Sequence, residues 1–301
     1  MTETTESAIP ENQELDYLIK LLDDEDENIY SNVRERFIFH GKNSTDYLEN
    51  YLSNILNAEN ILINKRANEI ISTLNYDKLE IELKNIIQNG GSDMLEDAMF
   101  VIASFGYPMI NKKEYKNKLE RLASEIRSRL SVTNPVISEI YPLNVLELIS
   151  KYLFKELGFK GNTKNYYEPD NSYINKVIDT RSGNPISLSV VYLLIAKRLN
   201  LPVYGINMPG HFILKYESGK ADEEYFIDPF NKGVLISVRE ASEYIKNSGN
   251  SGEEFIDIPY LKGANENEIL LRVMRNLIEA YKKENETSKS LQLEKLMLCF
   301  V

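Results

Sequence analysis

Cysteine and histidine are scarce in this sequence, and their scarcity excludes several kinds of site. The chain of 301 residues has one cysteine, Cys299, so neither an internal disulfide nor a thiolate metal cluster can form. Its two histidines, His40 and His211, are too few for a multi-histidine metal site. We therefore expect no metal and no other cofactor.

Positive charge is also in deficit, with 35 basic against 46 acidic residues and a formal net charge of −11. A surface this acidic repels phosphate backbones and anionic lipid, so we expect neither nucleic acid nor a membrane as partner. The longest apolar run, residues 186–196, is long enough only for a buried helix. The polar, acidic N-terminal sequence lacks the features of a signal peptide, which favours a cytoplasmic location.

The first part of the sequence has a helical pattern throughout. Residues 1–13 are predicted to form a flexible tail, and residues 14–131 a helical, HEAT-like region. Its acidic stretch 23–27 lacks the ligand spacing of a calcium loop, and we interpret it as a solvated turn that starts a helix. The first apolar stripe is Leu15, Leu18, Ile19 and Leu22, and the second runs from Ile29 to Gly41. Further helices are expected at 44–57, 61–73, 77–89, 92–105 and 112–130.

The character changes near Pro135, where a breaker separates two helical runs. A helix is expected at 138–157, followed by a loop at 158–172. Gly183-Asn184-Pro185 is a strong helix start, because Asn184 can cap the helix and Pro185 suits its first position. That helix should reach Leu199. Strands are expected at Val203–Asn207, His211–Tyr216, Tyr225–Pro229 and Gly233–Ile236, and helices at 238–246, 267–284 and 288–300.

These elements predict an α+β fold that is predominantly helical. A helix packs on a small antiparallel sheet, and two helices follow. The last pair carries Leu270, Val273, Leu277 and Tyr281 on one face, as a single tetratricopeptide unit would. One such unit cannot bury its own apolar face, so this pair must pack on another part of the chain.

His211 and Asp228 form the one compact chemical site that the pattern predicts. If the two strands pair with Tyr216 opposite Tyr225, His211 and Asp228 become diagonal neighbours on one face of the sheet. An aspartate beside a histidine fixes the imidazole tautomer and supports its protonated form, as a general base requires. The alternative is a structural hydrogen bond that holds two strands in register. His40 has no partner motif, and we interpret it as structural.

The sequence resembles the transglutaminase-like superfamily, specifically its bacterial SirB type, a transglutaminase core followed by a tetratricopeptide-like tail. The resemblance rests on an ordered series of segments that covers somewhat over half of the chain. It implies a core at 138–247 and a helical hairpin at 265–301, with His211 and Asp228 as the family's histidine and aspartate. The segments are RSGNPISLSVVYLLIAKRLNLPV (181–203), NMPGHFILKY (207–216), YFIDPFNKG (225–233) and LLRVMRNLIEAYKKE (270–284).

One position departs from the family pattern. Thiol members of the superfamily begin their helix with Gly-x-Cys, where the helix dipole lowers the pKa of the thiol. This chain has Pro185 at that place, and the best-placed hydroxyl is Ser187. Two residues along a helix correspond to a rotation of about 200°, so Ser187 is expected to face elsewhere. Further residues expected to line the cleft are Arg181, Gly183, Asn184, Asn207 and Gly210.

Two functions remain open. In the first, the protein is a non-catalytic relative that binds a peptide, protein or small ligand around His211 and Asp228, with its helical repeats as interaction surfaces. In the second, it is a hydrolase or acyl transferase acting on amides or esters, with Ser187 as nucleophile, His211 as base and Asp228 orienting the base.

Overall fold

The computed structural model describes residues 11–54, 60–108, 110–133, 140–208, 210–217, 224–236 and 262–300. The chain divides into two compact units, Met1–Ile81 and Glu82–Val301. The division falls inside one long helix, α4 (Ile61–Asn89). None of the described helices combines the length and the apolar content that crossing a membrane requires.

The first unit contains α1 (Glu11–Leu21), α2 (Glu27–His40), α3 (Lys42–Ser53) and the first part of α4. Its core includes both predicted stripes, since Leu15, Leu22 and Phe37 are buried in one cluster. The acidic stretch caps a helix, because the Asp26 carboxylate accepts a hydrogen bond from Asn28 N at 2.8 Å. The helix α1 begins at Glu11, inside the segment predicted to be a flexible tail.

The prediction of two helices at 61–73 and 77–89 is wrong. A single helix spans Ile61–Asn89. No glycine or proline stands between residues 73 and 77, so nothing local stops the helix, and Leu79 and Leu83 continue its buried face.

The helices of the second unit begin with α5 (Met94–Gly106) and α6 (Lys112–Thr133). Next come α7 (Pro142–Ser150), continued by a π-helical turn at Lys151–Glu156, a 3₁₀ turn at Pro169–Asn171, and α8 (Ile174–Thr180). The helix predicted from 138 begins at Pro142, which suits the first turn of a helix, while residues 138 and 139 lie outside the described residues. The helix α8 was not predicted.

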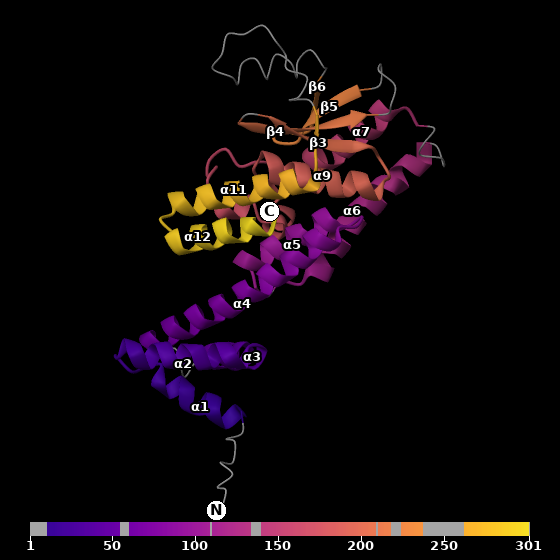
Figure 1. Cartoon of the computed structure of the whole chain (residues 1–301). Coiled ribbons are helices and arrows are strands. Elements are labelled where there is room, and N and C mark those ends of the chain that lie inside the picture. The colour runs from indigo at the N-terminus through magenta and orange to yellow at the C-terminus, as the bar shows by residue number, and fades with distance from the viewer. Residues whose placement is uncertain are drawn as a thin grey trace, which may run out of the picture. The chain divides into compact units, whose positions relative to one another are not determined.

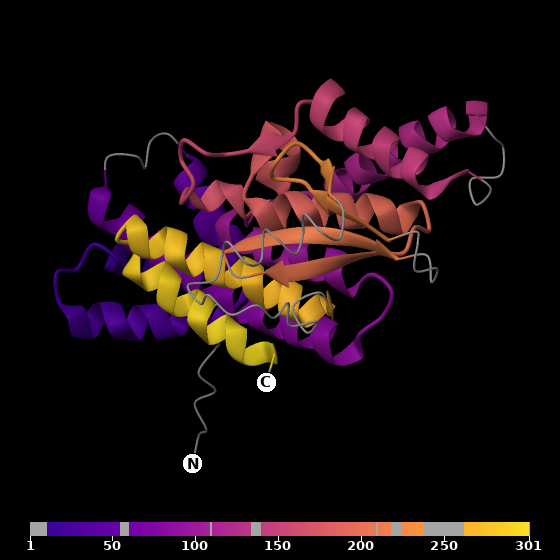
Figure 2. The ribbon, with the colours of Figure 1, turned by 90° about the horizontal axis from the view of Figure 1, so that it is seen from above.

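The central element is α9 (Pro185–Arg198), which is buried over nearly its whole length. It packs against two strands of a five-stranded sheet, and Figures 1 and 2 show the sheet lying over it. The sheet has the order β6-β5-β4-β3-β7 and all its pairs are antiparallel. Its strands are β3 (Val203–Met208), β4 (His211–Glu217), β5 (Glu224–Asp228), β6 (Val234–Ile236) and β7 (Gly263–Ala264).

The strand register is the predicted one. Tyr216 lies opposite Tyr225, and Leu214 lies opposite Ile227. A separate parallel pair joins β1 (Lys160–Gly161), inside the segment predicted to be a loop, to β2 (Ser182–Gly183), at the predicted start of the next helix. The predicted helix at 238–246 lies outside the described residues.

The chain returns to the core in a helical hairpin of α11 (Glu266–Lys283) and α12 (Thr287–Leu296), which ends in a 3₁₀ turn at Met297–Phe300. The four residues predicted to share an apolar face are all buried. The helix α11 packs against α5 and α9, so this hairpin belongs to the same compact unit as the sheet. The architecture is therefore α+β and predominantly helical.

Candidate functional site

The strand β4 begins at His211, and β5 ends at Asp228. Their register makes the two residues diagonal neighbours, and His211 Nε2 lies 2.8 Å from Asp228 Oδ2. Both side chains are buried, with 6% of His211 and 4% of Asp228 exposed. The geometry is that of a strong, charge-assisted hydrogen bond.

Asp228 has a second partner, Asn231, which the sequence analysis missed. The Asn231 backbone N–H donates to Asp228 Oδ1 at 3.1 Å, and its side-chain amide donates to Oδ2 at 2.7 Å. The local signal was Asp-Pro-Phe-Asn directly after a strand, a sequence typical of an Asx-type turn. Burial raises the pKa of Asp228, but the hydrogen bond and charge of His211, with the bonds from Asn231, outweigh burial and hold that pKa below its usual value.

The contact with Asp228 defines which ring nitrogen of His211 carries the hydrogen in the pair. A charged Asp228 can only accept, so Nε2 of His211 carries the hydrogen in the pair. In the neutral imidazole, Nδ1 is then the nitrogen that could take a proton from a nucleophile.

An aromatic wall stands beside the pair. Phe230 meets the ring of His211 edge to face at 6.1 Å, and Tyr166 meets Phe230 in the same way at 6.2 Å. Gly161 makes room for this arrangement, because a Cβ there would lie 2.5 Å from Phe230 Cε2. Gly210, with a φ of 70°, forms the turn immediately before His211. The sequence analysis did not identify Phe230 or Tyr166 as site residues.

The start of α9 has the cap that the sequence predicts. Asn184 Oδ1 accepts from Ser187 N at 3.0 Å, and Ser187 Oγ accepts from Asn184 N at 3.1 Å. Pro185 occupies the first turn, where its missing N–H costs nothing. This reciprocal pair is a capping box.

The hydroxyl of Ser187 serves this cap and the preceding loop. Its side chain is fully buried, and Oγ donates to the carbonyl of Asn171 at 2.5 Å. The Asn171 side chain in turn donates to the carbonyls of Asn165 at 2.7 Å and Tyr166 at 3.1 Å. The structure brings His211 and Asp228 together, while the hydrogen bonds of Ser187 Oγ go to the backbone of the cap and the loop.

The sequence profile of the transglutaminase-like superfamily matches residues 113–275, more than half of the chain. The chain belongs to the transglutaminase-like superfamily. It is 31% identical over 198 residues to a UPF0162 protein of Xylella fastidiosa (strain 9a5c), which covers 65% of this chain and 68% of that protein. It is 28% identical over 178 residues to UPF0162 protein YchA of Escherichia coli (strain K12), covering 58% of this chain and 65% of YchA.

A eukaryotic relative matches a shorter region. F-box only protein 21 of Mus musculus is 32% identical over 146 residues, which cover 46% of this chain and 22% of the mouse protein. This chain therefore spans about two thirds of the two bacterial relatives and about a fifth of the mouse protein. No solved structure matches this chain.

Three residues expected to line a transglutaminase-like cleft are in contact with other residues of the chain. Arg181, left-handed at a φ of 55°, donates to the carbonyl of Leu157 at 2.7 Å. Gly183 lies so close to Ser187 that a Cβ would be 2.6 Å from Oγ. Asn207 Oδ1 accepts from Arg272 Nη1 at 3.1 Å.

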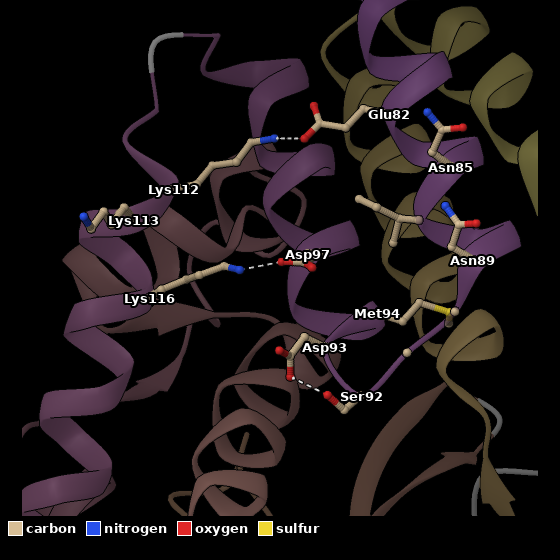
Figure 3. Close-up of a pocket in the computed structure, with 13 residues that line it drawn as sticks. Glu82, Asn85, Asn89, Ser92, Asp93, Met94, Asp97, Lys112, Lys113 and Lys116 are labelled. Carbon is tan, nitrogen blue, oxygen red and sulfur yellow. Dashed lines mark hydrogen bonds and ion pairs between the residues drawn. The ribbon is translucent and has the colours of Figure 1, made fainter.

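Two cavities are lined by described residues, and neither has His211 or Asp228 in its lining. One, of about 710 Å³, lies where the end of α4 meets the starts of α5 and α6. Figure 3 shows two of its three lysines paired with carboxylates of the wall, Lys112 with Glu82 and Lys116 with Asp97, each at 2.5 Å. The other, of about 430 Å³, is bordered by Arg127, Arg198 and Tyr216. Within the described ranges, no three His, Cys, Asp or Glu side chains form a group that could hold a metal ion.

Proposed function

We propose that this protein is a non-catalytic transglutaminase-like protein that binds a peptide, protein or small ligand around His211 and Asp228. The observation that carries the proposal is the start of α9. Proline stands where thiol members have their nucleophile, and the hydroxyl of Ser187 is buried and donates to the carbonyl of Asn171. A serine nucleophile needs a base in direct hydrogen-bond contact, whereas Ser187 Oγ, among the described residues, bonds to the backbone of Asn171 and Asn184.

We further propose that the protein is of the SirB type, with α11 and α12 as a tetratricopeptide-like tail and the helices before the core as HEAT-like interaction surfaces. The quoted segments and the apolar face of α11 support this assignment. The partner we propose is a protein or peptide. We place the binding in the cytoplasm, since a chain with a single cysteine has no disulfide to form in an oxidising compartment.

One observation favours the alternative, a serine hydrolase or acyl transferase. The Asp228–His211 pair has the order and the hydrogen bond of a base with its orienting carboxylate. In such an enzyme Ser187 Oγ would attack the acyl carbon while its proton passes to His211 Nδ1. The leaving alcohol or amine would then take that proton from His211. This route requires Ser187 to leave the capping box.

Catalysis is tested with a fluorophosphonate probe and a chromogenic ester on the full chain, Ser187→Ala and His211→Gln. We expect no probe on Ser187 by peptide mass spectrometry, and equal background ester hydrolysis by all three proteins. Labelling of Ser187 that disappears in His211→Gln would establish the alternative and contradict the proposal.

Binding is tested by selecting a displayed random peptide library on the immobilised full chain. Enriched peptides are then titrated against the wild type, Phe230→Ala and Phe39→Ala. Phe230 lies against His211, whereas Phe39 is an exposed aromatic residue of the first unit, 75% accessible. We expect weaker binding only to Phe230→Ala. Failure of any peptide to enrich, or equal binding to all three proteins, would contradict the proposed site.

A further inference from the structure

A half-buried cation lies close to the aromatic wall of the site. Arg272, on α11, donates through Nη1 to the neutral amide of Asn207 at 3.1 Å. No carboxylate of the described chain forms an ion pair with it. Two other partly buried arginines differ in this respect, since Arg198 is bound to Glu96 at 2.8 Å and Arg129 to Glu156 at 2.7 Å.

The surroundings of Arg272 do not compensate its charge. Burial lowers the pKa of the Arg272 guanidinium, the hydroxyl of Tyr166 acts weakly in the opposite direction, and the positive charge of Arg275 lowers it further. An arginine nevertheless stays protonated, so the protein holds an uncompensated charge in a partly dehydrated place. An anion bound there would restore the missing charge–charge interaction.

Aromatic side chains connect this cation to the His–Asp pair. Asn207 pairs with Phe212 across the hairpin, so it lies on the opposite face of the sheet from His211. The residue Tyr166 interacts with both Phe230 and Arg272. Its ring contacts Phe230, which contacts His211, and the charge of Arg272 acts on its hydroxyl.

Tyr166 and its neighbour Tyr167 form an accessible aromatic surface that suits a peptide. Tyr166 is 40% exposed and its neighbour Tyr167 is 53% exposed, with their rings in edge contact at 5.2 Å. Lys283 of α11 lies over the ring of Tyr167 at 5.3 Å. Tyrosine and arginine are both enriched at the centres of protein interfaces.

We propose that Arg272, together with Tyr166 and Asn207, anchors a carboxylate of a bound peptide whose chain continues over Phe230 toward His211. This inference rests on the proposed binding function and names the chemistry of its ligand. The planar guanidinium matches a carboxylate, with which it forms two parallel hydrogen bonds. The net charge of −11 disfavours a polyanion but imposes a much smaller penalty on a single carboxylate.

The test compares three acetylated dipeptides, titrated by NMR into the full chain. Acetyl-Leu-Phe with a free C-terminus carries a terminal carboxylate, acetyl-Glu-Phe-amide carries a side-chain carboxylate, and acetyl-Leu-Phe-amide carries none. The variants are Arg272→Gln and its matched control Arg275→Gln, an exposed arginine on the same helix. Inorganic phosphate serves as a competitor that carries charge without a peptide.

We expect at least one carboxylate peptide to bind the wild type and the neutral peptide to bind at least about tenfold more weakly, the difference that one charge-assisted pair provides. Arg272→Gln should remove this preference and Arg275→Gln should keep it. Which carboxylate peptide binds identifies the source of the carboxylate. Equal binding of all three peptides, binding of none, unchanged selectivity in Arg272→Gln, or phosphate displacing the peptide at equal concentration would overturn the inference.

The outcome separates this inference from the proposed function. If peptides selected from the library bind in a Phe230-dependent way but ignore Arg272 and the carboxylate, the site binds peptides and only the anchor is wrong. If Ser187 is labelled in a His211-dependent way, the proposed non-catalytic function is wrong whatever Arg272 does.

Discussion

Asp228 keeps its charge at a position that is 96% closed to solvent because three donors face it. The Nε2 hydrogen of His211 and both N–H groups of Asn231 replace the water that burial removes. The same bonds hold the end of β5 against the start of β4. At the scale of single residues, the pair therefore stabilises the hairpin whether or not it ever moves a proton.

Replacing Asp228 by Asn should lower the free energy of unfolding and change its dependence on pH. The folded pKa of Asp228 lies below its usual value of 3.8, so its contribution is present above about pH 4 and is lost as pH falls through the folded pKa. We expect Asp228→Asn to cost about 3 kcal/mol at pH 7, the loss typical of a broken buried pair. The difference in the free energy of unfolding between this variant and the wild type should become smaller below pH 4.

Urea unfolding between pH 7 and pH 3 measures this effect. Asp97→Asn is the matched control, because Asp97 forms a half-exposed pair with Lys116 and its loss should cost less than about 1 kcal/mol. If the free energies of unfolding of Asp228→Asn and the wild type differ by the same amount at every pH in this range, the charge of Asp228 does not contribute the expected stability.

At the scale of elements, α9 depends on its first turn. The cap residue Asn184 is 4% exposed, and besides Ser187 it binds Ser172 Oγ at 2.7 Å. The cap of α11, formed by Asn265 and Glu268, has the same reciprocal bonds but is exposed to water. Water can replace a lost bond at the second cap but not at the first.

Removing the two caps should therefore have unequal effects. We expect Asn184→Ala to lower the free energy of unfolding by about 2 kcal/mol or more, since it also leaves buried donors without partners. Asn265→Ala should cost about 1 kcal/mol or less. Urea unfolding followed by circular dichroism compares the two, and equal losses would contradict the role assigned to burial.

At the scale of the whole molecule, the C-terminal hairpin completes the core of the second unit. Tyr281 of α11 shares a buried hydrogen bond with Tyr173, with their hydroxyl oxygens 2.7 Å apart. The buried apolar residues of α11 are worth about 1.5–3 kcal/mol each, so together they rival the total stability of a typical domain. Those with large aliphatic or thioether side chains are Ile269, Leu270, Val273, Met274, Leu277 and Ile278.

Removal of residues 265–301 should abolish the cooperative unfolding of the second unit. Thermal melting followed by circular dichroism, and the dispersion of amide signals in NMR, measure the effect. Tyr281→Phe is the control, because it removes one hydroxyl and should cost about 1 kcal/mol while the unit stays folded. A shortened chain that still melts in one sharp transition near the original temperature would show that the hairpin is a separate module.

The sequence by itself determined the elements that obey a local rule. Apolar periodicity predicted α1, α2, α6, α9 and α11, since each buries a stripe at helical spacing. Asn184 and Pro185 marked the start of α9, because a cap needs only residues that are neighbours in sequence. The assumed pairing of Tyr216 with Tyr225 placed His211 and Asp228 on one face, and the structure has that pairing, whereas a slip of one residue would have put them on opposite faces.

Only the tertiary structure decided which distant groups meet. The hydroxyl of Ser187 finds the carbonyl of Asn171, 16 residues earlier, and Arg272 finds Asn207 across 65 residues. No local period or cap encodes such contacts, which follow from how helices and strands pack once their apolar faces are buried. The sequence could therefore predict that Ser187 faces away from the site, but not that its partner is the carbonyl of Asn171 or that Arg272 lies against Asn207.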